Sequence, residues 1–394
     1  MLKKFKDSLK YIKLKDILAA FIFILMIIPS LCFRLINKLK KRKLLLVTED
    51  GHTARDNGYH FYKYIKTNHP EDYCFYVIDK KSEGYDKVKE YGNIIQYGSL
   101  KHWLYYLSAN YNISNHKNGN PNAPLFYVIH VILGLYNNRV FLQHGITIND
   151  GIWLYYKNTK FKYFICGAKK EYEFISEKFG YPEGNVIYTG FPRFDNLYNN
   201  NVNKKQILIM PTWRNWLSRE TNALGEKYEF KKTDYYKNWN SFLNNSKFIK
   251  FIEKNNLQVL FYPHINMQKF LKDFNVKSKN IKITSTKTDI QKVLKESSIM
   301  ITDYSSVFMD FAYMCKPILF YQFDYNEFRQ KQYGEGYYNY KDGLGISVEK
   351  CDDLVDELIK LYEKGLNNKY LKKMNDFFEL KDQKNCERIY QYLK

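Results

Sequence analysis

The sequence predicts an α/β fold of two doubly wound halves, each built on a mostly parallel sheet, behind a basic N-terminal segment. Three observations carry this prediction. Short apolar runs alternate with amphipathic helical stretches from residue 44 onward. The polar, Asn-rich stretch 190–205 interrupts this alternation once, after which it resumes. The chain has 394 residues, which is long enough for two domains with full cores.

The N-terminal segment, residues 1–43, concentrates positive charge. It holds 12 Lys or Arg against two Asp, so it carries +10 of the formal net charge of +21. Apolar side chains recur at helical spacing among its first lysines, a pattern typical of a helix on a membrane surface: Leu2, Phe5, Leu9 and Ile12. The uncharged run 17–33 follows and is interrupted by Pro29. As a helix its 17 residues reach about 25 Å, less than the roughly 30 Å of a hydrocarbon core.

We therefore expect residues 1–43 to anchor the protein to a membrane. A signal peptide is disfavoured because no small-x-small cleavage site follows and cations resume at Arg34. Basic flanks on both sides of the apolar run indicate that both ends face the cytoplasm and its anionic lipid. A monotopic anchor in the inner leaflet fits these features, with a single-pass helix as the alternative. Nucleic-acid binding, the other interpretation of a basic tail, is disfavoured by the adjoining apolar run.

Several common chemistries have no sequence support. Six cysteines are scattered without a CxxC pair, which argues against a disulfide framework or zinc knuckle and favours a reducing, cytosolic setting. GxGxxG, GxxxxGK[ST], HExxH and GxSxG are all absent. No carboxylate cluster has the spacing of a metal site, so no metal ligands and no cofactor are predicted, and metal dependence stays open.

The first half, residues 44–198, shows the order expected of strands and helices in a parallel sheet covered on both faces. Helices are expected at 58–68 and 98–110. Strands are expected in the apolar runs "KLLLVTED", "YCFYVID", "YNISN", "VFLQHG" and "KYFICGA".

The second half, residues 199–394, repeats this order after the predicted hinge at 190–205. Strands are expected in "QILIMPTW", "LQVLFYPH", "NIKIT", "SIMITD" and "PILFYQ". Two doubly wound halves bind ligands in the crevice outside the carboxyl ends of their strands. The candidate functional residues are therefore those that directly follow each strand.

Two histidines hold such positions, one in each half. His144 ends an apolar strand, and Gly145 after it lets the backbone turn and a substrate approach closely. A neutral imidazole there can act as a general base. His264 follows Pro263 at the end of a strand in the second half. We expect the two to face each other across the crevice; the alternative for each is a core histidine bonded to a backbone carbonyl.

Phosphate-binding side chains are predicted in the second half. Thr212 and Arg214 follow a strand, and an Arg fork can hold phosphate oxygens, although a surface Arg is the simpler interpretation. Ser305 or Ser306 is expected to cap a helix, "SVFMDFAYM", whose N-terminus with two hydroxyls suits a phosphate or diphosphate. Asp310, one turn into that helix, could accept from a ligand hydroxyl, and Asp303 is expected to fix the turn.

Five stretches together resemble the CDP-glycerol glycerophosphotransferases of teichoic acid synthesis. They are "LQHGIT", "GFPRFDNL", "MPTWRN", "PHINM" and the long, specific "ITDYSSVFMDFAYMCKPILFYQFDYNEFR". The resemblance runs in order from residue 44 to the C-terminus. It implies a GT-B fold, with two Rossmann-like domains and an interdomain cleft, attached to the cytoplasmic face of the bacterial membrane.

The resemblance also implies roles for individual residues. His144 would deprotonate the acceptor hydroxyl, and His264 would contact the donor diphosphate. Pro211 and Thr212 would line the donor pocket, Arg193 would contact donor or linker, and Ser305 with Ser306 would bind donor phosphate. The acceptor hydroxyl would then attack the phosphorus that bears the alditol, and CMP would leave.

Two departures from the family pattern bear on substrate choice. The family commonly continues His-Gly as Thr-Pro-Leu-Lys, whereas this chain has Ile146, Thr147, Ile148 and Asn149 and so lacks that Lys. The family commonly has Arg-Gly-Phe-Tyr further on, whereas here Glu335 precedes Gly336. An acid thus replaces a cation that would help hold the donor.

The leading hypothesis is a membrane-associated transferase that moves glycerol phosphate or ribitol phosphate from CDP-glycerol or CDP-ribitol to a lipid-linked saccharide or growing polymer. One alternative keeps the GT-B fold but uses a nucleotide-sugar donor in cell-surface glycan synthesis. Another is a non-catalytic basic protein that binds membrane or RNA. The absence of a large extra domain leans toward a short product.

Overall fold

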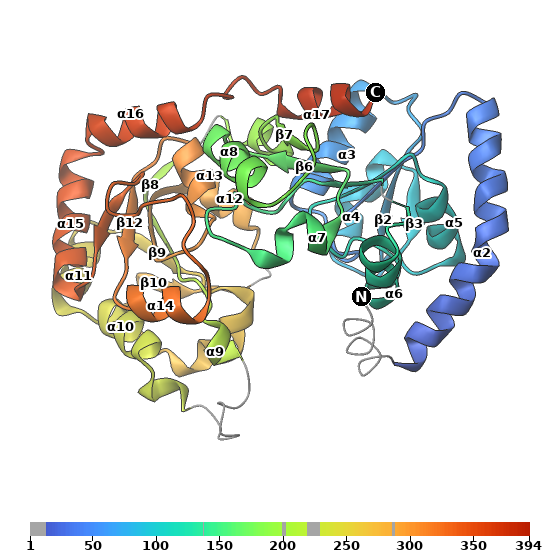
Figure 1. Ribbon diagram of the computed structural model, residues 1–394. Coiled ribbons are helices and arrows are strands. Elements are labelled where there is room, and N and C mark those ends of the chain that lie inside the picture. Colours follow the sequence, from blue (N-terminus) through green and yellow to red (C-terminus); the bar gives the residue numbers. More distant parts are fainter. Residues whose placement is uncertain (1–12, 137, 199–201, 219–228, 286–287) are drawn as a thin grey trace. The chain divides into compact units, whose positions relative to one another are not determined.

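The computed structural model describes residues 13–136, 138–198, 202–218, 229–285 and 288–394, which form two compact units (Figure 1). Unit 1 comprises the chain up to Ile146, Ile152–Asn196 and Leu380–Lys394; unit 2 comprises Thr147–Gly151 and Leu197–Glu379. The segment Ile152–Asn196 of unit 1 ends close to residue 198, where the sequence predicted the boundary. Two features were not predicted. Thr147–Gly151 belongs to unit 2, and Leu380–Lys394 returns to unit 1.

Unit 1 is built on a sheet whose strands all run parallel. Among the described residues the order is β3-β2-β1-β4-β5-β6-β7. The strands are β1 (Leu45–Thr48), β2 (Cys74–Ile78), β3 (Ile94–Gln96), β4 (Tyr111–Ser114), β5 (Arg139–Phe141), β6 (Tyr163–Cys166) and β7 (Val186–Tyr188). The central strand β1 is buried along its whole length, which explains why it reads as an unbroken apolar run.

Helices cover this sheet, and the C-terminal helix joins them. α17 packs against α3 and η4, so the end of the chain completes unit 1. The helices of unit 1 after the N-terminal one are α3 (Asn57–Asn68), α4 (Tyr85–Val88), η1 (Lys89–Tyr91), α5 (Leu100–Ser108), α6 (Ala123–Tyr127), η2 (Val128–Ile132), η3 (Ile152–Leu154), α7 (Tyr156–Thr159), α8 (Lys169–Lys178), η4 (Pro192–Asn196) and α17 (Asn385–Leu393).

The predicted anchor is represented by α2 (Leu14–Leu39), which is an integral helix of unit 1. Its start is fixed by Asp16, whose carboxylate accepts from the Lys13 backbone N–H at 2.9 Å and from Asn122 Nδ2 at 2.9 Å. One side of the helix packs against α5, with Ala19 in a core that includes Trp103. The helix continues through Pro29, which corrects the predicted interruption. The predicted stripe at residues 2, 5, 9 and 12 lies outside the described residues.

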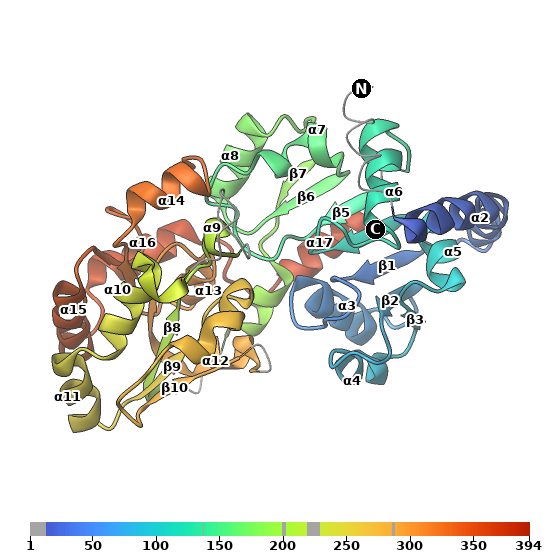
Figure 2. The same ribbon diagram turned by 90° about the horizontal axis from the view of Figure 1, so that it is seen from below.

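Unit 2 repeats the architecture with a second parallel sheet. Among the described residues the order is β10-β9-β8-β11-β12-β13, and Figure 2 shows β8, β9 and β10 side by side. The strands are β8 (Asn203–Met210), β9 (Gln258–Phe261), β10 (Ile281–Ile283), β11 (Ser297–Thr302), β12 (Ile318–Tyr321) and β13 (Ile346–Val348).

The core of unit 2 is rich in aromatic residues and centres on Trp239, which is fully buried and packs edge-on against Tyr321. Large aromatic side chains supply much of the buried apolar area in such a core. The helices of unit 2 are α9 (Asn215–Ser218), η5 (Phe230–Lys232), α10 (Asp234–Leu243), α11 (Ser246–Lys254), η6 (Ile265–Asp273), α12 (Ile290–Glu296), α13 (Phe308–Tyr313), α14 (Tyr325–Lys331), α15 (Cys351–Lys364) and α16 (Asn368–Phe377).

Candidate functional site

A polar cluster lies at the carboxyl ends of the central strands of unit 1. His144 follows β5 and His116 follows β4, and because these parallel strands are neighbours their following loops meet. The two imidazole rings stack with centroids 5.7 Å apart and planes at 11°. His144 is solvent-exposed and His116 half-buried, so the predicted base can reach a substrate.

Asp56 connects the parts of this cluster. Its carboxylate caps α3 by accepting from the Asn57 backbone N–H at 2.7 Å. It also accepts from Asn115 Nδ2 at 2.8 Å and from Arg193 Nη1 at 3.0 Å. Asn115 hydrogen-bonds in turn to the His144 ring through its backbone. Asp56 therefore fixes the residue that orients His144.

Asn57 holds the turn that leads into His144. Its side-chain amide donates to the carbonyl oxygens of Leu142 at 3.1 Å and Gln143 at 2.7 Å. Gln143 adopts a left-handed backbone conformation, with φ of 57°. The two bonds stabilise this turn, because a non-glycine residue at positive φ is unfavourable by itself.

The electrostatic environment lowers the pKa of His144. Desolvation by the surrounding protein is the main cause, although the ring keeps contact with solvent. The charges of His116 and Arg193 act in the same direction, whereas Asp56 and the hydrogen bond to Asn115 raise the pKa. The net result favours the neutral imidazole near neutral pH, which is the form that accepts a proton from a hydroxyl.

A buried carboxyl, Glu49, supports the turn that presents Asp56. It accepts from the backbone N–H of Asp56 at 2.7 Å, from that of Tyr59 at 3.2 Å and from Thr53 Oγ1 at 2.8 Å. Burial, with repulsion from Asp56 as the next cause, raises its pKa to about 7. This carboxyl thus titrates in the physiological range beside the cluster.

Arg193, predicted to contact donor or linker, lies on η4 and is mostly buried. Its guanidinium pairs with Asp56 and lies over the rings of Phe191 and Phe194, at 5.1 and 5.4 Å from their centroids. Its backbone N–H donates to Asn57 Oδ1 at 3.1 Å. In this structure Arg193 contributes positive charge beside His144, and a direct substrate contact stays a prediction.

The corresponding edge of unit 2 contains His264. Its Nδ1 accepts from the Asn266 backbone N–H at 3.2 Å, so in the neutral ring the proton is on Nε2, which can donate. The ring is half-buried and stacks on Trp213 with centroids 5.9 Å apart. The imidazole is therefore held in one orientation by neighbours that follow β8 and β9.

Ser305 and Ser306 follow β11 and remain half-buried, so their hydroxyls lie near the surface. The predicted serine N-cap is wrong, because α13 begins at Phe308 after Val307 and its first residues form a tighter turn. The N–H groups of Phe308 and Met309 donate to the carbonyls of Ser305 and Ser306, at 3.2 and 3.1 Å. α13 is shorter than the predicted helix "SVFMDFAYM", so its dipole contributes less to phosphate binding and the serine hydroxyls contribute more.

Arg214 follows β8 as predicted, but its side chain is 0% exposed and its donors are bonded to two carboxylates, so it is neither a surface Arg nor open to a phosphate. Nη2 donates to Asp303 at 2.8 Å, and Nε donates to Asp324 at 2.7 Å. Asp303 also accepts from the backbone N–H groups of Thr212 and Tyr304, both at 2.7 Å. Arg214 thus braces the loops after β8 and β11, and Asp303 fixes the turn as predicted.

The other predicted residues of unit 2 lie inside it. Pro211 and Thr212 are buried beside His264, whose backbone N–H donates to the Pro211 carbonyl at 3.3 Å. Asp310 is 3% exposed within α13. Its predicted contact with a ligand hydroxyl would need this helix to open.

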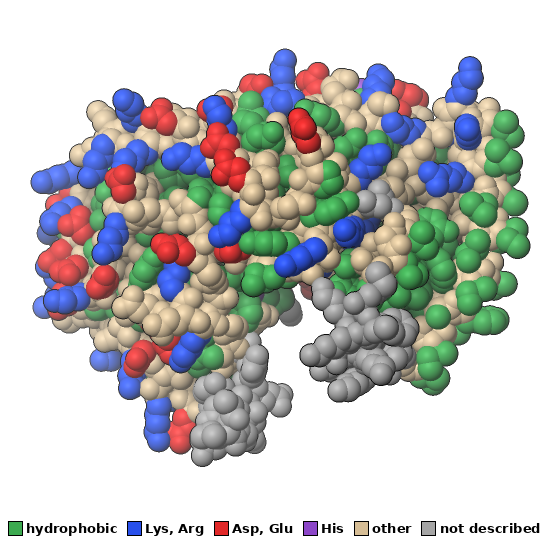
Figure 3. Space-filling model, in the orientation of Figure 1, with side chains coloured by type: hydrophobic (Ala, Val, Ile, Leu, Met, Phe, Trp, Pro, Cys, Tyr) green, Lys and Arg blue, Asp and Glu red, His purple; other side chains and the backbone are tan. Residues whose placement is uncertain are grey.

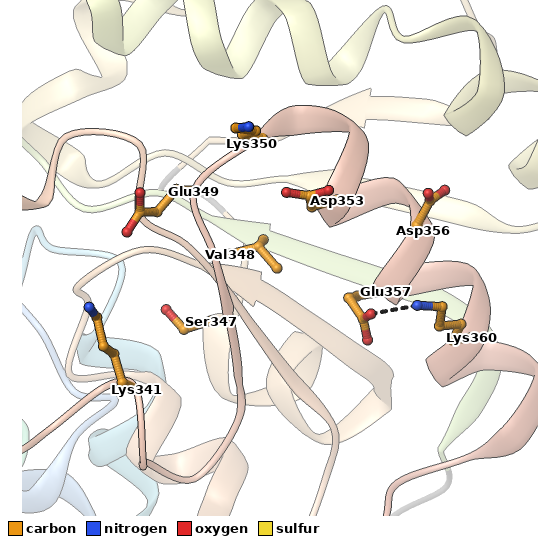
Figure 4. A pocket seen from close by; sticks show the side chains of 9 residues that line it. All are labelled: Lys341, Ser347, Val348, Glu349, Lys350, Asp353, Asp356, Glu357 and Lys360. Carbon is orange, nitrogen blue, oxygen red and sulfur yellow. Dashed lines mark hydrogen bonds and ion pairs between the residues drawn. The ribbon is translucent and has the colours of Figure 1, made fainter.

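A surface hollow of unit 2 lies apart from all of these residues (Figure 4). Lys360 and Glu357 form a hydrogen-bonded ion pair of 2.8 Å along one side of it. It lies beside β13 and α15 and is lined by Lys341, Ser347, Val348, Glu349, Lys350, Asp353, Asp356, Glu357 and Lys360. None of the predicted site residues lines this hollow.

Metal ligands are not grouped in the described residues, where no three His, Cys, Asp or Glu side chains are placed to hold an ion. The sequence interpretation missed Glu49, Asp56, Asn115 and His116. The available signals were the polar pair Asn115-His116 directly after the strand "YNIS" and the pair Asp56-Asn57 at the start of a helix.

Comparison with known proteins identifies the family and the fold. The sequence model of the family described as CDP-glycerol:poly(glycerophosphate) glycerophosphotransferase matches residues 31–394. The minor teichoic acid biosynthesis protein GgaB of Bacillus subtilis (strain 168) is 35% identical over 347 residues, which is 86% of this chain and 38% of GgaB. The teichoic acid ribitol-phosphate polymerase TarL of Staphylococcus aureus (strain NCTC 8325 / PS 47) is 27% identical over 56% of this chain and 39% of TarL. The chain thus spans less than two fifths of the length of these relatives.

A further relative has a length closer to that of this chain. The teichoic acid poly(glycerol phosphate) polymerase of Bacillus spizizenii (strain ATCC 23059 / NRRL B-14472 / W23) is 26% identical over 84% of this chain and 87% of its own length. Among solved structures, the wall teichoic acid polymerase TagF matches with a TM-score of 0.65 and 17% identity, over 100% of this chain and 97% of the TagF chain. The likeness to TagF confirms the predicted α/β, GT-B-like fold.

Proposed function

The chain belongs to the CDP-glycerol:poly(glycerophosphate) glycerophosphotransferase family, and we propose that it transfers glycerol phosphate or ribitol phosphate from a CDP-activated donor to a hydroxyl acceptor. The observation that supports this most is the exposed, neutral His144 in the cluster organised by Asp56. Relatives named as poly(glycerol phosphate) and ribitol-phosphate polymerases support both donors.

In the proposed reaction His144 accepts the proton of the acceptor hydroxyl. The acceptor oxygen forms a bond to the phosphorus that carries the alditol, and the bond from that phosphorus to the CMP oxygen breaks. The electron pair leaves with CMP, and the proton stays on the imidazolium, whose charge Asp56 stabilises. We propose that His264 donates from Nε2 to a donor phosphate and that Ser305 and Ser306 donate their hydroxyls to it.

We further propose that the acceptor is a lipid-linked saccharide or growing polymer, and that α2 holds the enzyme to the cytoplasmic face of the bacterial membrane. The described chain contains one helix long and apolar enough to cross a membrane, and this helix is α2. Its inner side packs on α5, whereas its outer side exposes Phe21 at 65%, Leu25 at 55% and Ile28 at 72% (Figure 3). A helix with one packed and one exposed apolar side suits a monotopic arrangement along the interface better than a span.

Basic residues near both ends of α2 support an anionic inner leaflet as its partner. Lys13 and Lys15 are exposed near the first turn, and Arg34, Lys38 and Lys40 near the last. Each such cation contributes about 1 kcal/mol of attraction to anionic lipid near the surface. A surface-bound enzyme and a lipid-linked acceptor would then meet in two dimensions.

A donor panel tests the proposed reaction. The full chain is incubated with a lipid-linked acceptor and radiolabelled CDP-glycerol, CDP-ribitol or UDP-sugars, and nucleotide release is measured. The proposal expects CMP release with an alditol donor. Nucleotide release with UDP-sugars alone would favour a glycosyltransferase instead.

A further inference from the structure

Arg329, on α14 of unit 2, is a half-buried guanidinium without a carboxylate partner in the described part of the chain. Nη1 donates to Asn149 Oδ1 at 2.6 Å and to the Gly334 carbonyl at 3.3 Å, and both acceptors are neutral. Nε is buried and bonds to none of the residues described. The guanidinium carbon lies 5.3 Å from the ring centroid of Tyr325 and 5.9 Å from that of Tyr340.

This arrangement leaves a positive charge uncompensated. Among the other buried guanidinium groups described, Arg193 pairs with Asp56 and Arg214 with Asp303. Arg139 bonds to the Thr159 carbonyl and has no carboxylate partner among the described residues, but it is only 7% exposed, whereas Arg329 is half-buried and keeps contact with solvent. Carbonyl oxygens and aromatic faces hold a guanidinium in place but do not neutralise it. A partly buried Arg with unused donors is therefore suited to an anion that arrives with a ligand.

The surroundings of Arg329 indicate which anion this is. Its neighbour Phe328 stacks on Tyr304 with centroids 3.9 Å apart, and Tyr304 directly precedes Ser305. Tyr340, over which Arg329 lies, donates its hydroxyl to the Tyr304 carbonyl at 3.4 Å. Arg329 is thus linked to the turn that carries the serine hydroxyls through Tyr340 and Phe328.

Asn149 lies on the segment Thr147–Gly151, which belongs to unit 2 together with Arg329. The segment that carries Asn149 is held to unit 2 by a β-bridge between Asp150 and Gly334, next to Glu335.

We propose that Arg329 binds a phosphoryl oxygen of the substrate, with Asn149 orienting the guanidinium. This inference rests on the proposed function for the identity of the ligand. Two sources offer the same chemistry, the diphosphate of a CDP-alditol donor and a phosphodiester of the acceptor.

The test uses the full chain and three variants. R329Q removes the charge. N149D keeps Arg329 but gives it an internal carboxylate. K331Q is the matched control, since Lys331 is an exposed cation on the same helix that pairs with Glu327 at 2.6 Å. Calorimetric titration measures the binding of CDP-glycerol and of inorganic pyrophosphate, and CMP release gives the acceptor KM.

We expect R329Q to weaken binding roughly 10- to 100-fold, the range for losing a hydrogen bond to a charged group. Weaker binding of CDP-glycerol and pyrophosphate by R329Q means that Arg329 binds the diphosphate of the donor. A raised acceptor KM with unchanged donor affinity means that Arg329 binds a phosphodiester of the acceptor. N149D should also weaken binding while raising the melting temperature, because it neutralises Arg329 within the protein. K331Q should match wild type.

Unchanged donor affinity and unchanged acceptor KM in R329Q would overturn the proposal. If Arg329 had only a structural role, R329Q would have a lower melting temperature and N149D would bind anions as tightly as wild type. Failure of the proposed function is distinguishable, because the wild-type chain would then release no CMP. The pyrophosphate titrations of wild type and R329Q would still decide whether Arg329 binds a diphosphate.

Discussion

Replacing Arg214 by Met tests whether this residue braces unit 2 or is reserved for a ligand. The substitution keeps an apolar side chain of similar length and removes the cation between Asp303 and Asp324, whose side chains are 0% and 6% exposed. Removing one partner of a buried ion pair costs about 3–5 kcal/mol. We expect the lower end here, because Asp303 keeps two backbone donors and Asp324 keeps the Tyr304 hydroxyl.

A loss of about 3 kcal/mol corresponds to a fall in melting temperature of roughly 6–12 °C for a unit of this size. Differential scanning calorimetry of R214M against wild type measures it, and D303N serves as a second removal from the same pair. The reasoning would be refuted if R214M unfolded within about 1 kcal/mol of wild type and had lost CDP-glycerol binding. That result would return Arg214 to the phosphate-binding role predicted from the sequence.

Three further predictions concern unit 1. Asp56 raises the pKa of His144, so D56N should lower the pKa of His144 further and move the acidic limb of the pH profile of CMP release to lower pH. D50N, which removes a carboxylate that interacts with His116, is the control. An unmoved acidic limb in D56N would contradict the assignment of His144 as the base. Glu49 has a folded pKa of about 7, above its ordinary value of 4.5, so its contribution to stability is present below pH 4.5 and lost as pH rises through 7, by up to about 3 kcal/mol. Chemical unfolding of E49Q should lack this decline between pH 5 and 8, and an unchanged slope would disprove the raised pKa. The variant F21Q/L25Q/I28Q should stop sedimenting with anionic vesicles while its core stays folded; retained sedimentation would argue against α2 as the contact surface.

The layered fold was predictable because the periodicity of apolar residues reports directly on buried parallel strands. Every strand predicted from an apolar run is present in one of the two sheets. The three-residue strands β3, β7 and β13 were missed, although β5 and β10, which have the same length, were predicted. The return of α17 to unit 1 was also missed, since its partner Asp195, which bonds the Asn385 backbone at 3.0 Å, lies 190 residues away.

The site was predictable where a single residue follows a strand, and not where residues distant in sequence combine. The positions of His144 and His264 after strands were predicted from the apolar runs before them, and their catalytic and binding roles stay predictions. The fork of Arg214 was misassigned because its partners lie 89 and 110 residues further on. Asp56 was not singled out in the sequence, because the neighbouring order of β1 and β4 brings it to Asn115 and the packing of η4 on α3 brings it to Arg193.

The most direct test of the central claim is CMP release by wild type and H144A with CDP-glycerol or CDP-ribitol and a lipid-linked acceptor. The account predicts that wild type releases CMP only when an acceptor hydroxyl is present. It also predicts that H144A is slower by roughly 10²- to 10⁴-fold, the range for a lost general base, at an unchanged melting temperature. Full activity in a folded H144A variant would contradict the account.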